Sequence, residues 1–182
     1  QIREIDRWVI RESIERVSER PGLSLSVNLS GRVLDDPLLL QWFHEELNRS
    51  GIDPSALIVE ITETAAVANV QDAIQFMREI KALGCRFALD DFGSGFSSFA
   101  YLRQLPVDIV KIDGGFIQNL ASSAEDQLFV QALTDVAKGL GKITVAEFVE
   151  NAETLTLLEK FGVDYAQGYH IGRPAPQMRE SA

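Results

Sequence analysis

The sequence has little of what many site chemistries require, since it contains one cysteine, Cys85, and two histidines among its 182 residues. A single cysteine cannot form a disulfide within the chain or a cysteine-based zinc site, and it fits a reducing compartment. Neither His44 nor His170 has a ligand partner at a useful spacing, so both are interpreted as structural. Candidate site residues must therefore be sought among other side chains.

Positive charge is also scarce. The chain carries 17 Lys and Arg residues against 27 Asp and Glu residues, which gives a formal net charge of −10. An acidic chain argues against a basic groove for nucleic-acid phosphates, so no DNA or RNA partner is expected. An anionic ligand would then need a bound cation to neutralise it.

Long apolar runs are absent as well. No charge-free apolar stretch approaches the roughly 18 residues of a membrane span. The first residues, QIREIDRWVIRES, are too charged for a signal peptide. These features predict a cytoplasmic chain, although a longer parent protein could carry a membrane anchor elsewhere.

What the chain does contain is an alternation of strand and helix patterns. Apolar, β-rich segments predict strands at residues 23–29, 56–62, 86–92, 108–113, 143–149 and 164–169. Capping residues and helical periodicity predict helices at residues 2–17, from Asp36-Pro37 to Gly51, from Val70 to Gly84 after Asn69, after Ser123 and after Asn151, with a further helical piece at 97–105.

This alternation predicts an α/β fold with a parallel sheet covered by helices, either an open doubly wound sheet or a closed (β/α)₈ barrel. A barrel collects functional residues from several strand ends on one face, whereas an open sheet concentrates them at one switch point. Polar residues stand near the end of all six strands, which favours the barrel; they are Asn28, Glu60, Asp90, Lys111, Glu147 and Gln167.

The strand count falls short of a complete barrel. A barrel needs eight strands, but the sequence shows six and begins inside a predicted helix. We therefore expect a TIM-like barrel that lacks roughly its first two strand–helix units. One N-terminally incomplete domain is expected over residues 1–176, followed by a C-terminal tail at 177–182.

The stretch FALDDFGSGFSS places Asp90 and Asp91 side by side at the end of a strand. Strand alternation points Asp90 into the barrel and leaves Asp91 where the pleat breaks into the glycine-rich loop. Two cations about 3.5–4 Å apart would offset the repulsion and could share Asp90. Oxygen ligands suit Mg²⁺ or Mn²⁺ and not zinc; the candidates are Asn28, Glu60, Asp90, Asp91 and Glu147.

Lys111 is the one cation in the row of strand-end residues, and it could hold a hydroxide or an anionic oxygen. Taken alone, this set admits a second interpretation. In an enolase-like barrel, carboxylates on successive strands hold Mg²⁺ and a lysine abstracts a proton. The Asp-Asp pair with one shared carboxylate suits a two-metal phosphoryl site better.

Six motifs in order resemble the EAL-domain phosphodiesterases of bacterial cyclic di-GMP signalling. They are SVNLS (26–30), EITE (60–63), DDFGSGFSS (90–98), KID (111–113), AEFVE (146–150) and QGY (167–169). The resemblance implies a modified (β/α)₈ barrel that hydrolyses cyclic di-GMP to linear pGpG with Mg²⁺ or Mn²⁺. It also implies a homodimer, and sensory or diguanylate-cyclase-like (GGDEF) domains in the parent chain.

The resemblance assigns roles residue by residue. One metal would be held by Asn28, Glu60 and Asp90, and the second by Asp90, Asp91 and Glu147, with Glu147 also cast as a general base. Lys111 would contact the nucleophilic water, and Gln167 would lie near the substrate. Glu150 would reach the guanine side, and Glu63 would anchor the loop after Asp91.

Two departures from the family pattern stand out. Phe148 replaces the usual glycine of the AEGVE motif, and its side chain is expected to face the helices. The Glu-Ala-Leu signature is absent, and with it a metal-ligand glutamate and a phosphate-contacting arginine.

The leading interpretation is an active phosphodiesterase in the parent protein, and the alternative is a cyclic di-GMP receptor that binds without cleaving. For the 182 residues alone, receptor is favoured over enzyme.

Overall fold

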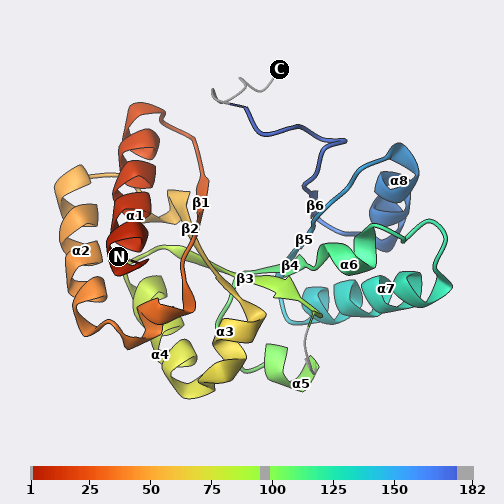
Figure 1. The fold of residues 1–182 in the computed structure, drawn as a ribbon, viewed down its shortest axis with the longest axis horizontal. Coiled ribbons are helices and arrows are strands. Elements are labelled where there is room, and N and C mark those ends of the chain that lie inside the picture. The colour runs from red at the N-terminus through yellow and green to blue at the C-terminus, as the bar shows by residue number, and fades with distance from the viewer. Residues whose placement is uncertain (1, 95–98, 176–182) are drawn as a thin grey trace. The chain divides into compact units, whose positions relative to one another are not determined.

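The computed structural model describes residues 2–94 and 99–175 (Figure 1). The predicted tail at 177–182 and residues 95–98 of the glycine-rich loop lie outside this range. Six strands form one sheet in the order β1-β2-β3-β4-β5-β6. The chain divides into two compact units, one up to Val110 and the other from Lys111 onward. Each unit is described separately below.

The first unit builds its helices around three parallel strands, because β1 pairs with β2 and β2 with β3 in parallel register. Its elements are α1 (Ile2–Glu19), β1 (Leu25–Asn28), α2 (Pro37–Ser50), β2 (Leu57–Thr62), α3 (Glu63–Ala68), α4 (Val70–Ala82), β3 (Arg86–Phe92) and α5 (Phe99–Leu102), with 3-10 turns at Gly31–Asp35 and Pro54–Ala56. The unit boundary falls inside β4 (Ile109–Ile112).

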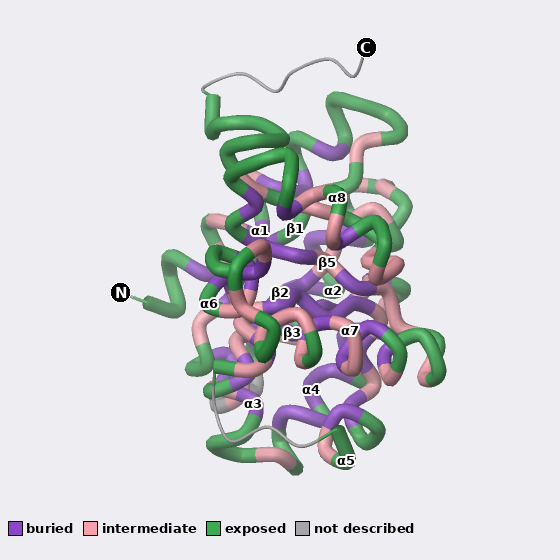
Figure 2. The backbone as a smooth tube through the Cα atoms, turned by 90° about the vertical axis from the view of Figure 1, so that its right-hand side faces the viewer, coloured by how far each residue is buried: buried purple, intermediate pink, exposed green. Residues whose placement is uncertain are grey.

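The core of the first unit is formed by the central strands and by the inner faces of the helices. Val59 and Ile61 on β2 and Phe87 and Leu89 on β3 are fully buried, and Figure 2 colours these strands as buried. Near-continuous apolar strands of this kind are covered on both faces, as parallel strands generally are.

Helices α2 and α4 begin directly after the capping residues predicted from the sequence. The Asp36 side chain accepts from the Leu38 backbone N–H, and Asn69 accepts from Asp72 N–H. These bonds satisfy donors that the first helical turn leaves unpaired. At the other end of α2, Gly51 adopts a left-handed φ of 66°, which ends the helix as the sequence predicts.

The second unit contains α6 (Gly114–Ile117), α7 (Ala124–Gly139), β5 (Ile143–Ala146), α8 (Ala152–Phe161) and β6 (Tyr165–Ala166). Strands β5 and β6 are parallel neighbours. Ser123 caps α7 and Asn151 caps α8, both as predicted. The rings of Phe116 on α6 and Phe129 on α7 stack with their centroids 4.0 Å apart, so the two helices pack together there.

The predicted alternation is confirmed, and the differences are local. β3 spans its predicted segment, residues 86–92, whereas the other strands are shorter than their apolar segments, most of all β6, which pairs over two residues. The short helix α3, which begins directly after β2 with Thr62 as its cap, was not predicted from the sequence. Within residues 2–94 and 99–175, no helix combines the length and apolar character that crossing a bilayer requires.

Candidate functional site

The register of the first three strands places the predicted polar residues on one face. Asn28 of β1 pairs with Glu60 of β2, and Glu60 pairs with Ala88 of β3. Partners in a row point the same way, and residues two apart on a strand share a face. Asp90, two residues after Ala88, therefore lies on the same face as Asn28 and Glu60.

Side-chain contacts agree with this register. The Asn28 side-chain amide donates to the Asp90 carboxylate at 3.3 Å. Glu60 and Asp90 are both about 6% exposed. Burial of ionised carboxylates favours a counter-charge nearby, because an ionised group loses its water on burial.

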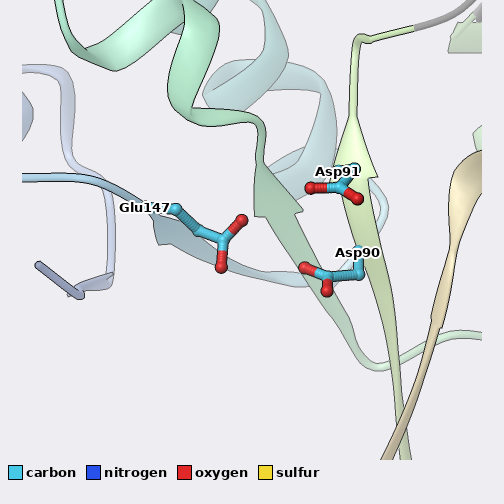
Figure 3. A group of neighbouring side chains, drawn as sticks. All are labelled: Asp90, Asp91 and Glu147. Carbon is cyan, nitrogen blue, oxygen red and sulfur yellow. The ribbon is translucent and has the colours of Figure 1, made fainter. Parts of the chain in front are cut away.

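Asp91 departs from ordinary strand geometry. Its φ is 54°, in the left-handed region that non-glycine residues seldom enter. This turn interrupts the strict alternation of the strand, and one carboxylate oxygen of Asp91 lies within 4.8 Å of one of Asp90. Figure 3 shows both side chains projecting from β3. Neighbours in sequence can thus present oxygen atoms to one cation.

The segment after Asp91 is held by Glu63, which opens α3 and is 1% exposed. Its carboxylate accepts from the Gly93 backbone N–H at 2.9 Å. Glu63 also acts on Tyr101: burial and then the Glu63 charge raise the pKa of that phenol to about 12. The glutamate that the resemblance casts as a loop anchor therefore touches the loop backbone.

In the second unit, Lys111 and Glu147 form a buried ion pair. The Lys111 Nζ lies 2.8 Å from the Glu147 carboxylate, and both residues are under 9% exposed. Lys111 lies on β4, whereas Glu147 follows the last residue of β5. Figure 3 labels the Glu147 side chain. The Glu147 N–H donates to the Ile112 carbonyl at 3.4 Å, which continues the strand pairing beyond β5.

A cavity of about 250 Å³ lies beside Glu147 in the same unit. It is formed where the chain beyond β5 runs beside the chain beyond β6: Gln167 N–H donates to the Ala146 carbonyl at 2.8 Å, and Val149 N–H donates to the Gln167 carbonyl at 3.0 Å. The predicted substrate residues Gln167 and Glu150 both line it; the full lining is Glu147, Phe148, Glu150, Gln167, Gly168 and Tyr169.

The predicted metal ligands fit a hard divalent cation by their chemistry. The predicted donors are the carboxylate oxygens of four acidic residues and one amide oxygen, with no sulfur or imidazole among them; the residues are Asn28, Glu60, Asp90, Asp91 and Glu147. Such donors suit Mg²⁺ and Mn²⁺, which prefer oxygen ligands. A buried acidic group of this kind can bind a metal ion, activate a bound water and stabilise charge on a phosphoryl oxygen.

One positioning residue was missed from the sequence. Asp6 on α1 is 5% exposed, and its carboxylate accepts both from the Ser30 N–H at 3.1 Å and from the Ser30 hydroxyl at 2.7 Å. These bonds fix the turn that follows Asn28. The only sequence signal is an acidic residue on the side of α1 that faces the core.

The EAL domain family matches residues 1–174 of this chain. The chain belongs to this family. Its relatives include cyclic di-GMP phosphodiesterase PdeB of Shewanella oneidensis, 45% identical over 177 residues that cover 95% of this chain and 21% of the relative. The EAL domain described here thus spans about a fifth of the length of that curated relative.

Solved structures confirm the EAL-type, TIM-like fold. The EAL domain matches the PaMucR phosphodiesterase in complex with c-di-GMP at a TM-score of 0.90 and 32% identity, covering 96% of this chain and 73% of that one. It also matches the FimX EAL domain of Pseudomonas aeruginosa bound to c-di-GMP at a TM-score of 0.90 and 34% identity, with 95% and 71% covered. The barrel interpretation, with only part of the barrel in this chain, is therefore confirmed.

Proposed function

We propose that this EAL domain, residues 1–176, supplies the catalytic site of a cyclic di-GMP phosphodiesterase. Water would attack one phosphorus of the cyclic dinucleotide, the P–O3′ bond would break, and linear pGpG would leave with a new 5′-phosphate. The observation that carries the proposal is the coincidence of predicted ligands with the register: Asn28, Glu60 and Asp90 lie on one face, with Asp91 turned beside them. The 45% identity to a named phosphodiesterase supports it.

The residues would divide the metal-holding task between them. Asn28, Glu60 and Asp90 would hold one divalent cation, and Asp90, Asp91 and Glu147 would hold the second. Bound Mg²⁺ or Mn²⁺ would supply an activated water and a clamp for the phosphoryl oxygens. The turned backbone at Asp91 supports this division, because it lets neighbouring carboxylates serve a shared centre.

Other residues would position groups around the reacting phosphorus. Lys111 is held by Glu147 at 2.8 Å, where its ammonium could orient the attacking water or stabilise an anionic oxygen. Glu147 could also take up the proton of that water. Gln167 and Glu150 line the neighbouring cavity and would contact the substrate. Glu63 would keep the loop after Asp91 in place through Gly93.

The decisive test is to incubate the protein with cyclic di-GMP and Mn²⁺ and to separate the products by chromatography. For the longest form of the protein, the expected result is formation of pGpG that depends on Mn²⁺ or Mg²⁺ and disappears in the presence of a chelator. For the 182-residue chain alone, which lacks the signature glutamate, binding without pGpG is expected. Tight binding without pGpG by the longest form would favour the alternative function, a cyclic di-GMP receptor. Absence of both binding and turnover would overturn both functions. The 182-residue chain is assayed beside the longest form of the protein.

We also propose that the domain acts as a homodimer and that the whole protein carries regulatory or diguanylate-cyclase domains. The short span of this chain relative to PdeB supports the presence of further domains. A related protein, MucR of Pseudomonas aeruginosa, is named a bifunctional diguanylate cyclase and cyclic di-GMP phosphodiesterase. Light scattering across a concentration series would test the dimer.

A further inference from the structure

Phe148 combines an unusual backbone conformation with an exposed aromatic side chain. It has a φ of 55°, and its large side chain is 54% exposed. A left-handed backbone is a genuine outlier for a bulky residue, and such outliers cluster at functional sites. The glycine that the family resemblance expects here would adopt this φ without strain. The aromatic side chain therefore replaces a residue that the backbone would accept more readily.

The ring of Phe148 packs against Gly114, the first residue of α6. A Cβ atom added to Gly114 would lie 2.3 Å from Cδ2 of Phe148, and its three nearest neighbours would all be Phe148 atoms. The missing side chain at 114 thus allows the ring to lie against the backbone there. Gly114 does not have a left-handed φ, so the ring is the main obstacle to a side chain at this position.

The exposed part of Phe148 borders the cavity that also contains Glu150, Gln167 and Tyr169. Tyr169 is a second exposed aromatic, with the Arg173 guanidinium 4.5 Å from its ring centroid. At about 250 Å³ the cavity is smaller than the roughly 300–1,000 Å³ of sites for whole drug-sized ligands. It suits one planar ring system.

The polar groups of the cavity select among planar ligands. Aromatic rings stack on any nucleic-acid base, because every base has a π-face. Glu150 is exposed and acidic, so it can accept from adjacent N–H donors. Guanine carries an N1–H and an exocyclic amino group side by side on one edge, whereas adenine carries only the amino donor there. A carboxylate therefore matches guanine better.

We propose that Phe148 is a base-stacking residue: its ring packs against Gly114 and stacks on one guanine of the ligand. This inference rests on the proposed function and goes beyond it, because the resemblance assigns no side chain to position 148. Stacking would fix the base in the cavity and so orient the adjoining phosphate toward Glu147. Glu150 would supply base selectivity, and Phe148 would supply affinity.

The test measures the dissociation constants of the protein for cyclic di-GMP and cyclic di-AMP, with Ca²⁺ in place of Mg²⁺ to prevent turnover. Phe148→Gly and Phe148→Leu should each weaken cyclic di-GMP binding by about 10-fold or more, because stacking on an aromatic side chain is lost. Phe148→Tyr, which keeps the ring, should stay within about 3-fold of the unaltered protein.

Gly114→Ala provides an independent arm, because it displaces the ring without altering Phe148. It should weaken binding in the unaltered protein and have almost no effect in the Phe148→Gly background, a coupling that a double-mutant cycle measures. Thermal melts of every variant show whether it folds, and the strain-relieving glycine variant should melt no lower than the leucine variant.

The outcomes distinguish a failure of the stacking role of Phe148 from a failure of the proposed function. Near-normal binding by both Phe148→Gly and Phe148→Leu would overturn the stacking role and leave the proposed function in place. Failure of the unaltered protein to bind cyclic di-GMP would overturn the proposed function together with the guanine assignment. A Glu150→Gln variant that lowers the preference for cyclic di-GMP over cyclic di-AMP, with Phe148 intact, would support the division of roles.

Discussion

The Lys111 ammonium lies 2.8 Å from the Glu147 carboxylate, and the two side chains are 9% and 11% exposed. Removing one member of a buried ion pair takes compensating charge away from the other member, which generally destabilises a protein by about 3–5 kcal/mol. The pair therefore fixes the Glu147 side chain, the proposed ligand, against β4. It also gives Lys111 a structural role beside its proposed role in the reaction.

The first prediction is that Lys111→Met will lower the free energy of unfolding by about 3 kcal/mol, measured by urea denaturation. Glu147→Gln should lower it less, because the remaining lysine can extend its flexible chain toward water. The double variant that carries both substitutions should lose less free energy of unfolding than the sum of the two single losses. Lys160→Met, at an exposed position of α8, is the control and should change stability by no more than about 0.5 kcal/mol. Strictly additive effects would show that the pair is uncoupled.

The second prediction is that Asp90→Asn will abolish turnover and weaken metal binding. Asp90 is buried, bonded by Asn28 at 3.3 Å and proposed to serve both cations, so the substitution removes one negative charge from a shared position. Isothermal titration with Mn²⁺ and product analysis measure the two effects. Asp135→Asn, at an exposed position on α7, should leave both unchanged. Near-normal turnover by Asp90→Asn would contradict the ligand assignment.

Much of the fold can be predicted from the sequence because its determinants are local. Each capping residue acts on a backbone N–H two or three positions away, as Asn69 does for Asp72 and Ser123 for Asp126. The strand-end polar residues recur with the period of a strand–helix unit, so their shared edge follows from parallel pairing. The positions of Asn28 and Glu60 at this edge follow from the sequence alone.

The features that could not be predicted depend on contacts distant in the sequence or on backbone torsions. In the sequence, Asp6 looks like an ordinary helical carboxylate. Its role depends on a contact with Ser30, which is 24 positions away. The left-handed φ of Asp91 and of Phe148 could not be predicted from residue type, because aspartate enters this region in only a small fraction of cases and phenylalanine rarely does. Short helices such as α3 are not predicted because fewer than two turns are too short to show a helical period.

The third prediction concerns Asp6, which connects α1 to the turn after Asn28. Asp6→Ala leaves the half-buried Ser30 N–H and hydroxyl without their acceptor, so stability should fall by about 1–3 kcal/mol. Ser30→Ala removes only the hydroxyl bond and should cost less. If the turn also positions Asn28, Asp6→Ala will weaken Mn²⁺ binding as well, whereas Glu12→Ala on the exposed face of α1 will not. Equal losses from Asp6→Ala and Ser30→Ala would show that the backbone bond contributes little.

The fourth prediction follows from the action of Glu63 on Tyr101. The pKa of Tyr101 is raised from 10.0 to about 12, first by burial and then by the Glu63 charge. Glu63→Gln removes the charge, so the Tyr101 pKa should fall while burial keeps it above its ordinary value. The titration is followed by tyrosinate absorbance, and Tyr101→Phe identifies which of the three tyrosines is responsible. An unchanged pKa in Glu63→Gln would leave burial as the whole cause.

The same shift has a consequence for stability at high pH. Because the folded pKa of about 12 exceeds the ordinary 10.0, the unfolded chain loses its Tyr101 proton first. The contribution is therefore fully present below about pH 10 and is lost as the pH rises toward 12. Tyr101→Phe should flatten the decline of the denaturation midpoint across this window, and Glu63→Gln should reduce it in part. Parallel declines in all three proteins would show that another group governs alkaline stability, and that Glu63 acts on the loop through Gly93 alone.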